Sequence, residues 1–294
     1  MLEGFVANNV INMFSLSLVF TLIVLNIYLS TQVLNITDLT CDASVALGGC
    51  SYGALVICGI NPVIALLTAT CLGAVAGLLT SSLVINIKVE PVLASIITLT
   101  AIETFIVKLS GFGHAIIISC GGKTVLSSHT AIENVVVAFI AVLILSILFY
   151  KILNSEYGLA MRVYGDGVVI ARSLGINTNR ILCVGLGMGN ALSAAAGALI
   201  TQILGTFNSG IGNGSMVFGL AAVIIGSKLV APNTIKSSII ACFIGSFVYK
   251  AIIALATFGG SGTLGSEYNG VITAVVLVVM IALAQDGKKK RRII

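Results

Sequence analysis

The sequence predicts an all-α protein, a polytopic bundle of membrane-spanning helices, and three observations support this fold class. Of the 294 residues, 58% are hydrophobic and only 9% are charged, whereas about a quarter of the residues in a soluble domain are charged. The mean hydropathy is +1.14. Several apolar stretches reach the length of about 20 residues that a helix needs to cross a bilayer core of about 30 Å.

The apolar stretches predict about nine crossings (eight to ten) within one membrane domain that covers 1–294. Continuous spans are expected at 10–34, 63–85, 92–109, 132–153, 181–204, 235–257 and 268–284. The segments 35–59 and 205–229 are polar or glycine-rich where they begin, and we expect either of them to be a broken or half-crossing helix. Irregular backbone at membrane depth is tolerated where protein surrounds it. The segment 110–131 is expected to lie outside the membrane.

The distribution of positive charge predicts the orientation. If the polar loop 156–180 is cytoplasmic, twelve of the 15 lysines and arginines lie on the cytoplasmic side, as the positive-inside rule requires. The N-terminus is then outside and the C-terminus inside. The basic tail 288–292 is interpreted as a topology anchor that also meets anionic lipid head groups. The net charge of +5 therefore does not indicate a nucleic-acid partner.

No motif predicts catalysis, a cofactor or a metal site. The fragment 121–124 reads GGKT, but the position of the first glycine of a phosphate-binding loop is occupied by Ile117. The two histidines both lie in the segment 110–131. The seven cysteines form no C-x-x-C pair and fall mostly in apolar spans, where cysteine is usually a small packing residue. Glycines spaced four apart, such as Gly73 and Gly77, are expected to let helices approach closely.

The loop 156–180 is the longest polar interruption, and it holds three of the five arginines. The run 167–174 is long enough for two helical turns, which Gly175 is suited to end because glycine adopts the left-handed conformation readily. Composition alone allows a plain solvated loop that its positive charge holds inside.

The spacing within this loop is more specific than its composition. Ala171, Leu174, Gly175, Ile176 and Asn177 read A-x-x-L-G-I-N. This pattern resembles the ATPase-contacting loop of ABC importer permeases, in the branch of branched-chain amino-acid and ribose permeases. The family's E-A-A signature falls on 169–171, where Val169 stands in place of the acidic residue. The segments 38–49 and 219–226 also resemble a sub-branch of uncharacterised or amino-acid-type permeases, so the likeness covers nearly the whole chain.

The resemblance implies the membrane subunit of a binding-protein-dependent importer in a bacterial-type plasma membrane. Two copies would form the pathway for a small solute, with an amino acid as the favoured class. Two ATP-binding subunits and an extracytoplasmic binding protein would be the partners, and ATP would be hydrolysed by the former. The residues expected to couple to the ATPase are Arg162, Asp166, Ala171, Arg172, Leu174, Gly175 and Asn177. The alternative is an ion-coupled secondary transporter, which would need no ATPase.

Polar residues inside the spans are the remaining candidates for the pathway. Glu103 and Lys250 lie at matched depth, about 12 Å below the outer surface. A lone charge there is costly, so they are expected to pair with each other, to line the pathway, or to reach the interface separately. Asn190 is expected to bond between helices. Asp38 suits an N-cap and Asp42 a first helical turn, with an inner gate as the alternative.

Overall fold

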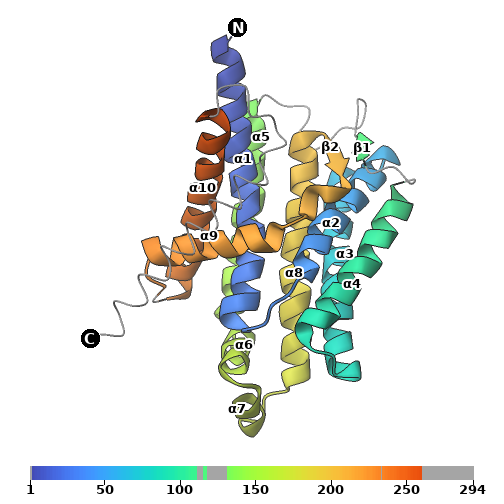
Figure 1. Cartoon of the computed structure of the whole chain (residues 1–294), viewed down its shortest axis with the longest axis vertical. Coiled ribbons are helices and arrows are strands. Elements are labelled where there is room, and N and C mark those ends of the chain that lie inside the picture. The colour runs from blue at the N-terminus through green and yellow to red at the C-terminus, as the bar shows by residue number, and fades with distance from the viewer. Residues whose placement is uncertain (1, 111–114, 118–130, 233, 260–294) are drawn as a thin grey trace.

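The computed structural model describes residues 2–110, 115–117, 131–232 and 234–259, and this part of the chain confirms the polytopic helical bundle. Long helices stand beside one another along a common axis, with the N-terminus at the end opposite to helix α7 (Figure 1). Seven helical stretches among the described residues are long and apolar enough to cross a membrane, or eight if the bent pair α5–α6 is one span. The predicted span 268–284 and the tail 288–292 lie outside the described residues.

The first half of the chain forms four helices and two π-helical extensions. In chain order they are α1 (Leu2–Tyr28), η1 (Leu29–Val33), α2 (Thr40–Ile57), α3 (Pro62–Ser82), η2 (Leu83–Ile87) and α4 (Pro91–Leu109). Pro62 and Pro91 each stand at the start of their helix, where a backbone N–H would have no intrahelical acceptor and its absence in proline costs nothing.

The second half contains the loop 156–180 and the segment 205–229. Its elements are α5 (Ala131–Leu153), α6 (Glu156–Asp166), α7 (Val168–Ser173), α8 (Thr178–Leu204), β2 (Thr206–Asn208), the 3-10 helix η3 (Ser209–Gly212), α9 (Ser215–Leu229) and α10 (Ile235–Gly259). Helix α9 runs across the bundle axis rather than along it (Figure 1), as expected of a half-crossing helix in 205–229.

A small β-ribbon departs from the expected all-α class. Strand β1 (Ala115–Ile117) pairs antiparallel with β2, and Ile116 stands opposite Phe207. Phe207 is fully buried, so the ribbon covers α2 at the end of the bundle opposite to α7 (Figure 1). Three-residue strands carry too little periodicity to be read from sequence, and these two are far apart in the chain.

The centre of the bundle is built by glycine contacts between α8 and its neighbours α2 and α3. A Cβ atom on Gly48 of α2 would collide with the carbonyl oxygen of Ala194 in α8. A Cβ on Gly77 of α3 would likewise collide with the carbonyl oxygen of Leu186. Small residues let helix backbones approach closely in membranes, where dispersion and polar contacts replace the hydrophobic effect. The predicted packing role of the pair Gly73 and Gly77 is thus confirmed.

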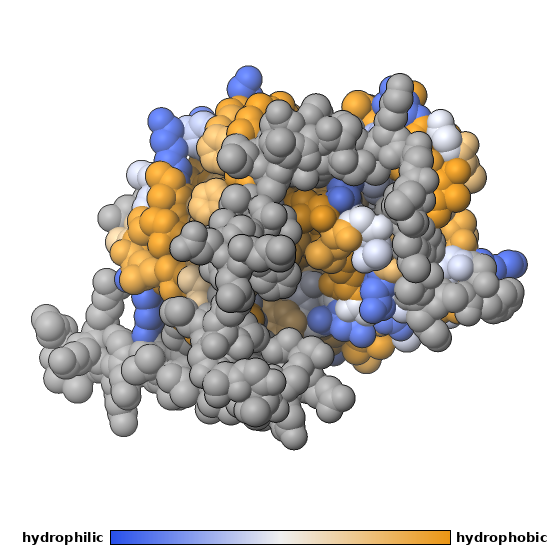
Figure 2. All heavy atoms as spheres, turned by 90° about the horizontal axis from the view of Figure 1, so that it is seen from above, coloured by the Kyte–Doolittle hydropathy of each residue, from blue (hydrophilic) through white to orange (hydrophobic). Residues whose placement is uncertain are grey.

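The flanks are apolar and exposed, in contrast to this centre. Within an 18-residue apolar window of each candidate span, 78% of the residues are buried in α2 and in α8, but only 28% in α4. Viewed from the end opposite to α7, the flanks that grey atoms do not cover are mostly hydrophobic (Figure 2). Such surfaces are suited to lipid or to other membrane helices.

Candidate coupling surface and translocation region

Helix α7 forms the tip of the bundle, and its end is fixed by backbone geometry. Gly175 has a φ of +77°, and its N–H donates to the carbonyl of Arg172 at 3.0 Å. The N–H of Ile176 donates to the carbonyl of Ala171, also at 3.0 Å. These two bonds form a Schellman motif, the usual glycine-terminated helix end. The predicted two-turn helix that ends at Gly175 is therefore confirmed.

The tip presents apolar side chains on its outer face. Val169 is 81% exposed, Ile170 is 54% exposed and Leu174 is 65% exposed, whereas Ala171 on the inner face is fully buried. We call Val169, Ile170 and Leu174 the α7 knob. Neighbouring exposed apolar side chains at a polar tip are typical of a protein-docking surface.

The predicted coupling residues divide into those that shape the tip and those that stand on its surface. Arg162 donates from Nη2 to the carbonyl of Leu153 at 3.1 Å, across the bend between α5 and α6. The Asn177 side chain caps α8 by accepting from the N–H of Arg180 at 3.2 Å. Asp166 and Arg172 are exposed, and Arg172 also donates to the Thr178 hydroxyl at 3.4 Å.

The break before α2 contains a buried polar network. The Asp38 carboxylate accepts from the N–H of Thr40 at 2.9 Å and from the Asn190 amide at 2.7 Å. The oxygen of Asn190 accepts from the Ser44 hydroxyl at 2.7 Å, and Thr40 bonds with Thr80 at 2.8 Å. The predicted interhelical role of Asn190 is confirmed. Asp38, however, is not the N-cap residue, because Leu39 holds that position and the Asp38 carboxylate also binds α8.

Asp42 joins the start of α2 to the start of α9. The expected break in 35–59 precedes α2, which is itself one continuous helix long and apolar enough to span. Asp42 lies in the first turn of α2, as predicted. Its carboxylate accepts from the backbone N–H groups of Gly214 at 3.0 Å and Met216 at 2.7 Å. Gly214 is the N-cap residue of α9 and Met216 lies in its first turn, where N–H groups have no intrahelical acceptor. Asp42 therefore caps a helix that is 172 positions away in the sequence.

Glu103 and Lys250 are not paired within one copy of the chain. Helices α4 and α10 lie on opposite sides of the bundle (Figure 1). Lys250 instead places its ammonium 4.5 Å from the centre of the Phe20 ring, a cation–π distance. The pairing hypothesis is wrong because depth along a helix says nothing about which side of the bundle the helix occupies.

Glu103 stands on a polar stripe of α4. It is exposed, and with Thr100, Thr104 and Lys108 it lines an open concavity of about 520 Å³. These residues recur at helical spacing, so they share one face. An uncompensated carboxylate at this depth is too costly to face lipid acyl chains.

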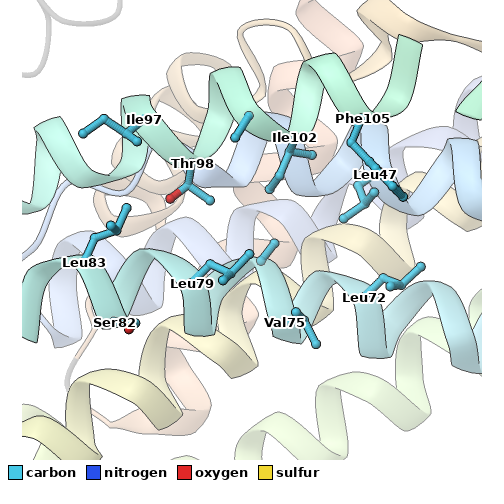
Figure 3. A pocket seen from close by; sticks show the side chains of 12 residues that line it. Leu47, Leu72, Val75, Leu79, Ser82, Leu83, Ile97, Thr98, Ile102 and Phe105 are labelled. Carbon is cyan, nitrogen blue, oxygen red and sulfur yellow. The ribbon is translucent and has the colours of Figure 1, made fainter. Parts of the chain in front are cut away.

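A second concavity lies on the same flank, between α3 and α4, and it is apolar. Its volume is about 490 Å³. Leu72, Val75 and Leu79 of α3 line it, and Ile102 and Phe105 of α4 extend toward α3, as Figure 3 shows. The α4 helix thus separates an apolar concavity from a polar one.

Sequence reasoning missed two contributors to these sites. The amide of Asn26 in α1 donates to the Ser193 hydroxyl in α8 at 2.7 Å, and both side chains are buried. An asparagine inside an apolar span was the available signal for this contact. The exposure of Val169 and Ile170 had a signal too, since apolar residues flanking Ala171 in a polar loop have no local partner.

The comparisons with known proteins agree with the geometry. Residues 9–281 match the family described as branched-chain amino acid transport system / permease component. The chain is 30% identical over 275 residues to the tyrosine transport system permease protein of Clostridioides difficile, covering 94% of this chain and 91% of that protein. It is 28% identical over 163 residues to the branched-chain amino acid permease protein LivH of Escherichia coli, covering 55% and 48% of the two chains.

One further relative and the search of solved structures complete the comparison. The uncharacterized protein RP368 of Rickettsia prowazekii is 28% identical over 271 residues, covering 90% of this chain and 94% of that protein. No solved structure matches the chain. The family match spans most of the chain. The chain therefore belongs to the family of branched-chain amino acid transport permeases, and it is a membrane permease of an ABC importer rather than an enzyme.

Proposed function

We propose that this permease imports an amino acid, with an ATP-binding subunit docked on the α7 knob. Two such subunits, a second copy of this chain and an extracytoplasmic binding protein complete the complex. Membership of an ABC importer family argues against the ion-coupled secondary transporter. The chain leaves ATP hydrolysis to its partner, since its one GGKT fragment lacks the first glycine of a phosphate-binding loop.

The observation that carries the proposal is the exposure of the α7 knob on a rigid support. Val169, Ile170 and Leu174 are more than half exposed, while the Schellman motif at Gly175 and the buried Ala171 hold the helix in place. A partner that covers these side chains buries apolar surface, and the helix that carries them is already ordered. Pre-organisation of this kind lowers the entropic cost of docking.

The charged residues of the tip then have separate roles. Asp166 and Arg172 are exposed beside the knob and are positioned to contact the ATP-binding subunit. Arg162 and Asn177 are exposed as well, but their side chains stabilise the tip, because their hydrogen bonds join α5 to α6 and cap α8. Exposed charges steer association more than they add affinity, so the knob supplies most of the contact energy.

The orientation follows from this docking. If α7 is cytoplasmic, the N-terminus lies outside and the C-terminus inside. The end of the bundle opposite to α7, where the β1–β2 ribbon closes over α2, then faces the binding protein.

The α4 stripe is the proposed wall of the pathway. Glu103, Thr100 and Thr104 form an exposed polar face inside a membrane-spanning helix, and a second copy placed against this face would shield it from lipid. A carboxylate on the wall attracts the ammonium group of an amino acid. Asp42 and Asn190 are not part of this stripe, and their hydrogen bonds hold the segments before α9 and α2 in place. Lys250 lies against Phe20 on the opposite side of the bundle.

The relatives support the substrate class. The printed name of the Clostridioides difficile relative assigns it to tyrosine transport, and the Escherichia coli relative to branched-chain amino acids. We propose an amino acid for this chain on that basis, with the side-chain preference residing in the binding protein.

The docking proposal is tested by Val169→Asp, which places a charge in the centre of the knob. We expect recovery of the ATP-binding subunit with the tagged permease from gently solubilised membranes to fall at least tenfold. Val63→Asp is the matched control, because Val63 is 54% exposed at the opposite end, in the first turn of α3. Equal recovery with the two variants, each eluting as a single folded species, would contradict docking at α7.

A further inference from the structure

Helix α6 contacts the end of η1 through a glycine. A Cβ atom on Gly165 would collide with the carbonyl oxygen of Val33 and would lie 3.3 Å from the carbonyl carbon of Leu34. The two backbones can meet at this place because glycine has no side chain. Val33 is the last residue of η1 and Leu34 is its C-cap. Gly165 therefore contacts the chain at the point where the break before α2, residues 35–39, begins.

This contact is one end of a stripe on the inner face of α6. Gly158, Met161 and Gly165 are spaced three and four residues apart, so they share one face of the helix. A Cβ on Gly158 would collide with the carbonyl oxygen of Leu153. Met161 is fully buried in the core cluster that also contains Val33. Two backbone contacts with a buried side chain between them leave α6 little freedom to slide over its neighbours.

Helix α6 is also joined closely to α7, which carries the knob. Only Gly167 separates the two helices. Its N–H donates to the carbonyl of Val163 at 3.2 Å, and its carbonyl accepts from the N–H of Ala171 at 3.0 Å. Backbone hydrogen bonds thus reach from Gly167 into both helices. A displacement of α7 is therefore expected to carry the last turn of α6 with it.

The break that Gly165 contacts contains an unusual backbone conformation. Asn35 has a φ of +55°, in the left-handed region that residues other than glycine seldom adopt. It is exposed, and it lies between the α6 contact at Leu34 and Asp38, which the Asn190 amide holds on α8. A residue of this kind between two fixed points is suited to absorb a change in backbone angles.

We propose that Gly165 is a positioning residue through which movement of the α7 knob reaches the break before α2. Displacement of the knob carries α6, the backbone contact moves the peptide between Val33 and Leu34, and Asn35 takes up the change in backbone angles. The inference rests on the proposed docking for the source of the movement, whereas the contact itself lies within one chain. It is separate from the hydrogen bond of Arg162 to the end of α5.

Hydrogen exchange in the full-length permease tests the contact without any partner. The N–H groups of Leu34 and Ile36 donate to carbonyls of η1 at 2.9 and 2.8 Å, so these two amides report on the break. Gly165→Ala should speed their exchange about threefold or more, because the added methyl group forces α6 away from η1 and local opening becomes easier. Gly187→Ala is the matched control, since a Cβ there meets Leu78 at an ordinary contact distance of 3.6 Å.

Exchange in the complex with the ATP-binding subunit tests the transmission of movement. Trapping with ATP and vanadate should change the exchange of the two reporter amides about threefold or more in wild type and in Gly187→Ala. In Gly165→Ala these amides should not respond, although the ATP-binding subunit is recovered in the wild-type amount. Recovery of the subunit thus separates a failure of docking from a failure of transmission.

Distance measurements leave Gly165 unchanged and apply even if its alanine variant does not fold. Spin labels are introduced as non-canonical amino acids, because the chain has seven cysteines of its own. The labelled positions are all exposed, at Ser173 in α7, Gln32 in η1 and Val63 in α3. Nucleotide trapping should change the distance between η1 and α3 by about 2 Å or more, the scale of helix shifts in switching proteins. The distance between α7 and η1 should stay the same.

Four results would overturn the inference. The first is equal exchange of the two reporter amides in Gly165→Ala and Gly187→Ala. The second is a wild-type complex that traps nucleotide without any change at these amides, and the third is a nucleotide response that survives in Gly165→Ala. The fourth is a label on α7 that moves relative to η1 while the distance between η1 and α3 is unchanged.

Discussion

The irregular segments that precede α2 and α9 satisfy their polar groups in different ways. Helix α1 runs toward the α7 end and is followed by a break and α2, while α8 runs the opposite way and is followed by a break and α9 (Figure 1). In the first break, side chains satisfy the polar groups, since Asp38 binds both the Thr40 N–H and the Asn190 amide. In the second, glycines with positive φ turn the chain, at Gly205 and Gly214.

Because of this difference, the start of α9 depends on α2 for its helix cap. The first turn of α9 has no capping side chain of its own, and its N–H groups are satisfied by Asp42 of α2. Irregular backbone within a membrane protein persists only where such groups are satisfied internally. A displacement of α2 must therefore move α9 or expose unsatisfied donors. Asp42 thus couples the start of α9 to α2, and the segment before α2 is in turn tied to α8 through Asn190.

The largest expected loss of stability comes from removing the Asp38 carboxylate, which is the acceptor in the segment before α2. Asp38→Ala leaves the Thr40 N–H and one of the two Asn190 amide hydrogens without their acceptor, while the amide keeps its bond to the carbonyl of Leu186. Each unsatisfied donor costs about 1–3 kcal/mol. We expect a total loss of about 2–4 kcal/mol, measured as a lower temperature of half-loss of the monodisperse species in detergent. Asp38→Asn keeps one acceptor oxygen and should lose less. Equal losses for the two variants would mean that the network does not hold the break.

A smaller and more local effect is expected from Asp42→Ala. Loss of a helix cap costs about 1–2 kcal/mol, and here the lost cap belongs to α9. Hydrogen exchange should therefore speed up at the amides of 214–216 while those of the first break stay protected. Asp42→Asn retains an acceptor and serves as the control. Faster exchange at the amides before α2 as well would contradict the prediction that loss of the Asp42 carboxylate affects α9 alone.

The smallest expected effect is the difference in stability between alanine variants of the two glycines before α9. Gly205 and Gly214 have similar positive φ values, 65° and 75°, so alanine at either position costs about 1 kcal/mol of backbone strain. A Cβ at Gly205 meets open space, whereas one at Gly214 lies 3.1 Å from the Phe218 ring. Gly214→Ala should be the less stable variant in the same thermal assay. The reverse order would show that the Phe218 ring relaxes freely and that φ alone sets the cost.

Local features of the fold could be predicted from the sequence, and long-range ones could not. The α7 helix and its end at Gly175 follow from six or seven adjacent residues, so the sequence was sufficient there. The partner of Asp42 lies 172 positions away, and no spacing rule reaches that far. Glu103 and Lys250 illustrate the same limit, because hydropathy reports the depth of a residue but not the side of the bundle on which it lies.

The candidate site was predicted in part for the same reason. The pattern from Ala171 to Asn177 identified the tip, but it did not show that Asn177 caps α8 or that Arg162 bonds to the end of α5. Those roles depend on where the neighbouring carbonyl and amide groups lie in space.

The hydrogen bond between Arg162 and Leu153 has a mechanical consequence. The α5–α6 pair bends by 70°, and a bend of this size in a bare turn would act as a hinge that absorbs an applied load. Arg162 braces the inside of the elbow with bonds to the carbonyls of both Leu153 and Gly158. We infer that a force applied at α7 would reach α5 through this braced bend instead of being absorbed by it.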